Sequence, residues 1–295
     1  MAMDMVRSLL SVPGNQPRML EKAPGYDADA LILDLEDSVP ADRKAEARAM
    51  TAEFISSGAG GAMTYVRVNS PESGLLEDDL AAVVTRGLAG IQCPKTDSPE
   101  AIVAIDAKLS HLERERGLEP GSVEIIAGIE SVAGVYHCYD ILSAAARVGS
   151  CVVGVAENGD LQRDVGYAHS ESGVESLYIR SKVILEARHA GITNALDGTF
   201  SAINDMERFE AEAAQARGLG YRGKKLIHPK QIESTNRIFM PSAQEIDFHE
   251  RVLAALAAAE AEGKAATTVD GLMVDIAMAV NARRVLSWAS RISNP

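Results

Sequence analysis

Three carboxylates occur within four residues at the end of one apolar segment. They are Asp34, Glu36 and Asp37, and the segment is Ala30-Leu31-Ile32-Leu33. A continuous apolar run is typical of a strand buried on both faces, as in a parallel sheet. Carboxylates at the end of such a strand lose hydration and repel one another, so a cation should compensate them. The stretch therefore predicts a bound metal ion, an arginine, or both.

The same arrangement, an apolar run followed by a polar residue, recurs along the chain. The residues at these ends are, in chain order, Glu36 and Asp37, Arg67 and Asn69, Lys95, Glu130, Glu157 and Asp160, Asp197, and His228. Glu130 with Asp160 would form a hard oxygen site that suits Mg²⁺ and leaves positions open for substrate oxygens. No lysine stands obviously beside this pair. Arg67 and Lys95 are available to balance the carboxylates.

Several of these candidates also have a purely structural interpretation. Asp37 precedes a helical segment and can hydrogen-bond at its start, and Arg67 can simply neutralise Glu36. Asp197 can belong to a turn. His228 is more typical of a hydrogen-bonded strand-end residue than of a general base.

Eight apolar runs supply the strands that must position these side chains. They are Val6–Val12, Ala28–Glu36, Met63–Asn69, Leu88–Lys95, Val123–Glu130, Cys151–Ala156, Asn194–Asp197 and Lys225–His228, with helical patterns at Ala41–Ser56, Leu76–Arg86, Pro99–Arg116 and Val174–Ala190. This alternation predicts an α/β fold, a (β/α)₈ TIM barrel over residues 1–240, with its chemistry at the C-terminal strand ends. An open doubly wound sheet is the rival, but no glycine fingerprint follows the first run.

Residues 241–295 form an extension that barrel closure does not require. Pro241-Ser242 predicts a helix start, and Ala243–Gly263 is rich in alanine and glutamate and therefore helical. Lys264–Gly271 has the composition of a loop, and Leu272–Ile292 predicts a second helix. We expect this C-terminal helical extension to reach a neighbouring subunit.

Composition excludes some classes of partner. The chain has 295 residues, 46% of them hydrophobic, and a formal net charge of −13, which argues against nucleic acid or an anionic membrane surface as the main partner. Cys93, Cys138 and Cys151 lie in or beside apolar segments without metal-like spacing, so we expect reduced core cysteines. The N-terminus lacks a basic segment followed by an apolar one, and the expected location is cytoplasmic.

A set of motifs spread over almost the whole chain resembles one known family. The motifs are Arg7 to Asn15, Leu33 to Val39, Lys44 to Arg48, Val66 to Asn69, Pro94-Lys95, Ile129 to Ser131, Asp160-Leu161 with Asp164-Val165-Gly166, Ile227-His228-Pro229, and Asp270 to Asp275. In this order they resemble the citrate lyase β-subunit-like CoA-ester lyases of the HpcH/HpaI aldolase superfamily.

The resemblance implies a barrel that is usually a homotrimer and that holds Mg²⁺ through Glu130 and Asp160. It also implies that Arg67 binds the oxo acid and that Asp275 reaches an adjacent subunit's site as the proton-transfer residue. Other residues complete the candidate set: Glu36 and Asp37 as catalytic residues, Arg18 and Lys22 for CoA phosphates, Lys95 and Glu130 for substrate, and the Ile227-His228 backbone along the CoA arm.

Two positions depart from the family pattern. About two extra residues separate Gly154 from Asp160, which leaves Glu157 and Asp160 as alternative second metal ligands. The spacing downstream of Asp160 keeps the family pattern and favours Asp160. Ser11 stands where an aromatic residue is common, which bears on the shape of the CoA entrance.

The implied reaction is cleavage of a β-hydroxyacyl-CoA into a 2-oxo acid and acetyl-CoA, or its reverse. Citramalyl-CoA, malyl-CoA and citryl-CoA are the candidate substrates, and the sequence does not choose among them. The alternatives are an aldolase that acts on a free hydroxy-oxo acid without CoA, and a citrate lyase β subunit that is active only in a complex.

Overall fold

A computed structural model describes residues 6–58 and 63–293. Residues 1–5, on which the expected absence of a targeting segment partly rests, lie outside the described residues. The chain divides into two compact units, Met1–Arg237 and Ile238–Pro295. Each unit has its own core and is described by itself. Among the described residues, no helix combines the length and apolar character needed to cross a membrane.

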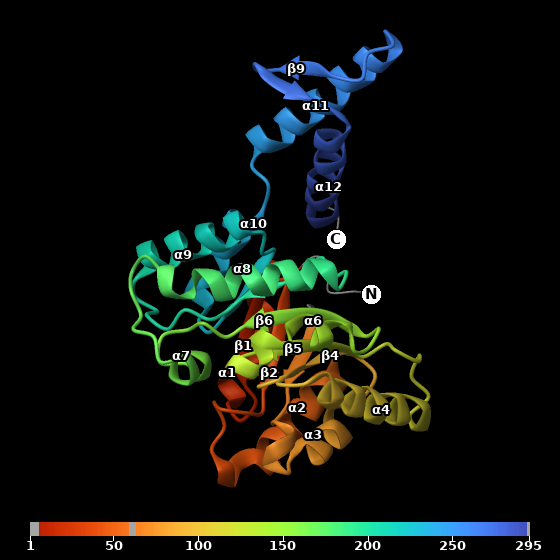
Figure 1. Ribbon diagram of the computed structural model, residues 1–295. Coiled ribbons are helices and arrows are strands. Elements are labelled where there is room, and N and C mark those ends of the chain that lie inside the picture. Colours follow the sequence, from red (N-terminus) through yellow and green to blue (C-terminus); the bar gives the residue numbers. More distant parts are fainter. Residues whose placement is uncertain (1–5, 59–62, 294–295) are drawn as a thin grey trace. The chain divides into compact units, whose positions relative to one another are not determined.

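The first unit is a closed barrel of parallel strands in the order β1 to β8 (Figure 1). Its strands are β1 (Ser8–Pro13), β2 (Ala30–Asp34), β3 (Met63–Arg67), β4 (Leu88–Cys93), β5 (Glu124–Ile129), β6 (Val148–Val153), β7 (Leu196–Asp197) and β8 (Gly223–Leu226). The predicted (β/α)₈ barrel is thereby confirmed. All five residues of β2 are buried, as the continuous apolar run indicated. A hydrophobic core is formed by side chains of β1, β2, β3, β5, β6 and β7 and by Val6, which precedes β1. Its buried members are Val6, Leu9, Ala30, Ile32, Tyr65, Ile126, Val152 and Leu196.

Helices follow the strands and surround the barrel. They are α1 (Pro17–Lys22), α2 (Lys44–Ser57), α3 (Leu76–Val83), α4 (Pro99–Glu115), α5 (Val132–Tyr136), α6 (Cys138–Ser143), α7 (Asp160–Val165), α8 (Val174–His189), α9 (Met206–Leu219) and α10 (Ile232–Phe239), with short 3₁₀ turns η1 (Ala23–Gly25), η2 (Ala41–Arg43), η3 (Pro71–Ser73) and η4 (Pro229–Gln231). Local chemistry sets their ends. Ser98, for example, caps α4 by accepting a hydrogen bond from the Ala101 amide, and Pro99 occupies the first helical position.

Two strands lie earlier in the chain than predicted. β6 begins at Val148 rather than Cys151, because Ser150 is buried and donates its hydroxyl hydrogen bond to the Asn194 carbonyl. β8 begins at Gly223 rather than Lys225, because an apolar pattern does not recognise Lys224 as a strand residue. Both lysines are buried because each has a buried hydrogen-bond acceptor within the barrel unit. The three cysteines are buried and free, which confirms their core positions.

The second unit contains α11 (Ala243–Ala261), the hairpin β9 (Thr267–Val269) and β10 (Leu272–Val274), and α12 (Ile276–Ser293). The predicted loop over Lys264–Gly271 and the predicted helix start at Leu272 were therefore wrong. Asp270 and Gly271 both have positive φ, 51° and 78°, and form the two-residue turn that pairs Val269 with Leu272. An Asp-Gly pair between hydrophobic residues is a strong hairpin signal that the predictions of a loop and a helix overlooked.

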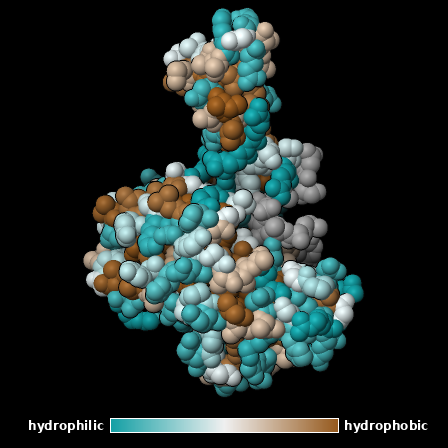
Figure 2. All heavy atoms as spheres, turned by 45° about the vertical axis from the view of Figure 1, so that its right-hand side comes forward, coloured by the Kyte–Doolittle hydropathy of each residue, from teal (hydrophilic) through white to brown (hydrophobic). Residues whose placement is uncertain are grey.

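Hydrophobic side chains from these elements form the core of the second unit, namely Val252, Leu256, Val269, Val274, Ala279 and Ala282. Others remain exposed on its surface. Figure 2 shows hydrophobic side chains between hydrophilic ones on this unit. Its exposed large hydrophobic residues are Leu272, Met273, Ile276 and Val280, which flank Asp275 in the sequence.

Candidate active site

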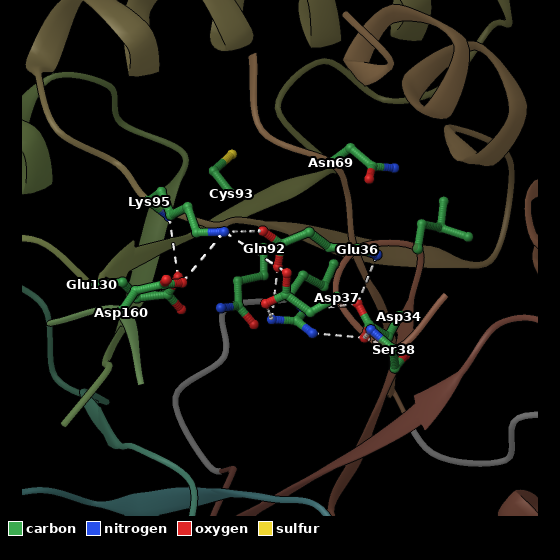
Figure 3. Close-up of polar contacts among 12 residues, drawn as sticks. Asp34, Glu36, Asp37, Ser38, Asn69, Gln92, Cys93, Lys95, Glu130 and Asp160 are labelled. Carbon is green, nitrogen blue, oxygen red and sulfur yellow. Dashed lines mark hydrogen bonds and ion pairs between the residues drawn. The ribbon is translucent and has the colours of Figure 1, made fainter. Parts of the chain in front are cut away.

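Most of the candidate residues lie after barrel strands, where the C-terminal ends of parallel strands meet on one face. Asp34 and Arg67 are the last residues of β2 and β3, and Lys95 and Glu130 follow β4 and β5 closely. Asp160 is the first residue of α7, after β6. Hydrogen bonds and ion pairs join these five residues with Glu36 and Asp37 into one polar cluster (Figure 3). We refer to these seven residues as the strand-end cluster.

Arg67 is the cation that the three carboxylates after β2 were predicted to require. Asp34 and Arg67 are paired in register on neighbouring strands. The guanidinium holds Asp34 through two parallel bonds, Nε to Oδ1 at 2.7 Å and Nη2 to Oδ2 at 2.6 Å. Its Nη1 lies 2.8 Å from Glu36 Oε2 and 3.4 Å from Asp37 Oδ2. This fork geometry is available to arginine and not to lysine.

Burial and charge act in opposite directions on these carboxyl groups. Burial works to raise the pKa of Asp34, but the charge of Arg67 outweighs it and holds that pKa well below its usual range. The pKa of Glu36 is raised, because burial and the neighbouring charges of Asp37 and Glu130 together exceed the opposing effects of Arg67 and Lys95. Asp37 is the exposed member, with 61% of its side chain accessible, and is the carboxylate most open to a ligand.

A second layer of contacts holds the loop after β2. Lys44 on α2 donates to the Leu35 and Glu36 carbonyls, at 2.7 and 2.8 Å, and to Asn69 Oδ1 at 2.7 Å. Asn69 in turn donates to Asp79 Oδ2 through its side chain and its backbone amide. Asn69 is buried, so it positions the loop and is not exposed to a ligand.

Lys95 lies between the two groups of carboxylates (Figure 3). Its ammonium nitrogen is 3.0 Å from Glu36 Oε1, 3.8 Å from Asp37 Oδ1 and 3.3 Å from Asp160 Oδ2. Its backbone amide donates to Glu130 Oε2 at 3.2 Å. The expectation that no lysine stands beside the Glu130 and Asp160 pair was therefore wrong. Burial works to raise the pKa of Asp160, but the charge of Lys95 and the bond from Arg163 lower it overall.

Glu130 and Asp160 have the donor chemistry for a Mg²⁺ site. Two carboxylates are hard oxygen donors, and Mg²⁺ commonly takes one or two from a protein and the rest from water and substrate. The described residues contain no group of three or more His, Cys, Asp and Glu that could enclose a metal. Room for the Glu130 side chain depends on glycines: a Cβ added at Gly154 would lie 2.7 Å from Glu130 Cγ, and one at Gly128 would lie 3.2 Å from Oε1. The residues present fit Mg²⁺.

Asp160 and Glu157, the alternative second ligands, have different partners. Asp160 contacts Lys95 and so belongs to the strand-end cluster. Glu157 lies 3.9 Å from Arg208 on α9 and leaves 45% of its side chain exposed. These contacts favour Asp160.

The structure gives His228 and Asp197 structural partners. His228 Nδ1 accepts the Lys230 amide, and Gln231 Oε1 accepts the His228 and Ile227 amides, so His228 caps η4. Asp197 is fully buried between Lys224, 2.5 Å away, and Arg180, 3.1 Å away. It is not simply part of a turn, as one interpretation held, but the centre of a buried ion network.

The remaining candidates in the barrel unit have no described contact with the strand-end cluster. Arg18 and Lys22 are both exposed on α1, the helix after β1, one helical turn apart. Ile227 is 42% exposed directly after β8. Asp275 belongs to the second unit, where its Oδ1 accepts the Ala277 and Met278 amides at 3.0 and 3.1 Å and caps α12. Asp275 therefore has a local structural role at the start of α12.

Sequence reasoning left Asp34 and Lys225 out of the candidate site residues. Asp34 was one of the three carboxylates at the end of the Ala30–Leu33 segment, and its position at a strand end opposite Arg67 was the available signal. Lys225 on β8 is almost fully buried and donates to Gln92 Oε1 on β4 at 2.8 Å, across the barrel. Burial, with the nearby charge of Arg67, lowers the pKa of Lys225 to about 8.

Lys225 should make stability depend on pH in a defined direction. Folding lowers the pKa of Lys225 from 10.5 to about 8. Below pH 8 the amine is charged in both states, so the whole free-energy cost of burying that charge reduces the stability of the fold. That penalty disappears as pH rises from the folded value toward the unfolded one. The stability of Lys225→Met relative to the native chain should therefore fall by about 2 kcal/mol between pH 7 and pH 10. Urea unfolding at both pH values measures this, and a constant difference would contradict it.

Comparisons with known proteins agree with the motifs. Residues 7–229 match the HpcH/HpaI aldolase/citrate lyase family. The citrate lyase subunit beta of Escherichia coli (strain K12) is 36% identical over 284 residues, 96% of this chain and 93% of that protein. The mitochondrial citramalyl-CoA lyase of Homo sapiens is 30% identical over 294 residues, 97% of this chain and 86% of that protein.

A solved structure has the same architecture. Protein CitE from Mycobacterium tuberculosis, in complex with magnesium, acetoacetate and coenzyme A, superposes with a TM-score of 0.76 at 25% sequence identity, covering 97% of this chain and 98% of that chain. The family match, the level of identity and the confirmed barrel all lead to one conclusion. This chain belongs to the HpcH/HpaI aldolase/citrate lyase family.

Proposed function

We propose that this protein is a Mg²⁺-dependent carbon–carbon lyase that cleaves a β-hydroxyacyl-CoA to a 2-oxo acid and acetyl-CoA, or catalyses the reverse reaction. The observation that carries this proposal is the strand-end cluster, in which Glu130 and Asp160 lie beside Arg67 and Lys95 at the C-terminal end of the barrel. The proposal is supported by relatives whose names and bound ligands include citramalyl-CoA, magnesium, an oxo acid and coenzyme A.

In this reaction the β-hydroxyl group loses its proton and the bond between the α- and β-carbons breaks. The electron pair passes to the α-carbon as a thioester enolate, which takes up a proton to give acetyl-CoA. Glu130 and Asp160 would hold Mg²⁺, which supplies Lewis-acid chemistry to the oxo-acid oxygens when bound. Arg67 would bind the oxo-acid carboxylate, and Asp275 would transfer the proton at the α-carbon.

The proposed substrates differ at one carbon. Citramalyl-CoA, malyl-CoA and citryl-CoA carry a methyl group, a hydrogen or a carboxymethyl group there. We place citramalyl-CoA and malyl-CoA ahead of citryl-CoA because a stand-alone enzyme is the commoner context. Arg18 and Lys22 would pair with CoA phosphates, since both are exposed cations on a chain whose net charge is −13.

The test is a panel of these thioesters assayed with and without Mg²⁺, following acetyl-CoA release from the purified chain. Metal-dependent release from at least one thioester is expected. Cleavage of free hydroxy-oxo acids without CoA thioester turnover would instead support the aldolase alternative.

A second candidate is a β subunit that works only inside a complex. The 36% identity to a citrate lyase subunit favours it. If the purified chain is inactive alone but becomes active when partner subunits are added, this candidate replaces the stand-alone enzyme.

Arg67→Lys should reduce kcat/KM by about a hundredfold, because lysine keeps the charge but loses the planar fork. Steady-state kinetics and the melting temperature should be measured together. Arg147→Lys is a matched control, since Arg147 is also buried and pairs with Asp106 and Glu113, which belong neither to the cluster nor to the contacts that hold the loop after β2. A fall in melting temperature without a selective loss of kcat/KM would show that Arg67 only neutralises its neighbours.

A further inference from the structure

Lys95 contacts all four carboxylates that we place at the centre of the chemistry. The ammonium group lies 3.0 to 3.8 Å from Glu36, Asp37 and Asp160, and the backbone amide binds Glu130. The three acids contacted by the ammonium come from two separate segments, the loop after β2 and the start of α7. Without a cation among them these carboxylates would repel one another.

The backbone at Lys95 is strained in order to make these contacts. Its φ is 48°, in the left-handed region that residues with a Cβ rarely adopt. Two sets of contacts compensate the energetic cost of that strain. The Lys95 backbone amide donates a hydrogen bond to Glu130 Oε2, and the ammonium group contacts the acids. Strain of this kind at a non-glycine residue persists where surrounding contacts over-determine it and is common at functional sites.

Asp160 is already paired on both oxygens. Lys95 Nζ lies 3.3 Å from Oδ2, and Arg163 donates to Oδ1. Arg163 is on the same short helix and its side chain is 77% exposed, so it can move into water at little cost. The Lys95 side chain is only 35% exposed, and its ammonium is held by two further acids. A divalent ion that binds Asp160 therefore meets a positive charge 3.3 Å from Oδ2.

We propose that Lys95 is an internal counter-cation: its ammonium holds Glu36, Asp37 and Asp160 together in the metal-free protein and competes with the divalent ion for Asp160. This inference rests on the proposed metal site and adds a regulator of its affinity. With a divalent ion on Asp160, the ammonium would give up Asp160 and keep its contacts with Glu36 and Asp37. Lys95 is thus a positioning residue that prevents tight metal binding before substrate contributes its own oxygens.

The experiment is Mn²⁺ binding to the full-length protein without substrate, measured from the electron paramagnetic resonance signal of free Mn²⁺. Lys95→Met should bind Mn²⁺ about tenfold or more tightly, because a unit positive charge close to the site is removed. Lys95→Arg, which keeps the charge, should bind close to the native affinity. Lys182→Met is the matched control, since Lys182 makes a similar ion pair with Glu186, 2.7 Å away on α8.

Glu130→Gln separates this inference from the metal site itself. If Glu130→Gln weakens Mn²⁺ binding but Lys95→Met leaves it unchanged or weaker, the counter-cation role is wrong and the metal site stands. If Glu130→Gln binds Mn²⁺ as tightly as the native chain, the metal site is wrong and the role of Lys95 is wrong with it. Should Lys95→Met fail to fold, Lys95→Gln replaces it, with the rise in melting temperature on adding Mn²⁺ as the readout.

Discussion

Glu130→Gln should lower metal-dependent turnover by about a thousandfold while leaving the barrel folded. Glutamine has nearly the same shape, so the space left by Gly128 and Gly154 still accommodates it. Its amide oxygen can still accept the Lys95 backbone amide, 3.2 Å away. What the variant loses is the negative charge that a divalent ion requires. A large loss of turnover with an unchanged melting temperature would therefore assign Glu130 to the metal.

The companion variants decide the second ligand. Asp160→Asn should behave like Glu130→Gln, because Asp160, unlike Glu157, lies in the strand-end cluster beside Lys95. Glu157→Gln is the matched control and should remain active, since Glu157 pairs with Arg208 on α9. Titration of Mg²⁺ into each variant after treatment with chelator gives the measurement. Full activity in chelator, or in Glu130→Gln, would exclude a metal ion from the reaction.

The barrel and its functional end could be predicted because they depend on local pattern. Apolar runs of strand length alternate with helical periods, and parallel strands bring their C-terminal residues to one face. That rule alone placed Arg67, Lys95 and Glu130 near the acids after β2. It does not depend on loop conformation, since each of these residues lies within two positions of a strand end.

The details that could not be predicted depend on contacts between distant segments. Lysines are normally exposed, so the predicted eighth strand omitted Lys224, and its pattern did not indicate that Lys225 is buried. Their burial depends on Asp197, Glu212 and Gln92, which come from other parts of the chain. The contact between Lys95 and Asp160 likewise depends on a left-handed backbone that no periodicity encodes. By contrast, the hairpin at Asp270-Gly271 had a local signal, and its omission was a misreading.

Asp275 should act in the site of a neighbouring subunit, and two inactive variants should restore activity when mixed. Asp275→Asn removes the acid but retains the cap of α12, because asparagine caps as well as aspartate does. Loss of turnover in this variant would therefore not reflect loss of the cap. Both capping bonds use Oδ1, so the local role leaves the carboxylate able to serve a second one.

The exposed residues beside Asp275 suit a surface that docks on another copy. Leu272, Met273 and Ile276 are 55%, 68% and 59% exposed, which is unusual for large hydrophobic side chains next to a candidate catalytic acid. In a head-to-tail ring, each site would combine Glu130 of one subunit with Asp275 of the next. Equal mixing of Glu130→Gln and Asp275→Asn chains leaves about one quarter of such sites intact.

The mixed sample should therefore recover about one quarter of native activity after subunit exchange, although each variant alone is inactive. Exchange itself is verified by mass spectrometry of chains that carry different tags. An arrangement in which each subunit supplies its own Asp275 gives no recovery, because every site then lacks either Glu130 or Asp275. The double variant Glu130→Gln/Asp275→Asn, mixed with native chains, provides the control, because intact sites then form only between two native subunits. No recovery in the first mixture, with exchange demonstrated, would place Asp275 in its own subunit's site or outside the chemistry.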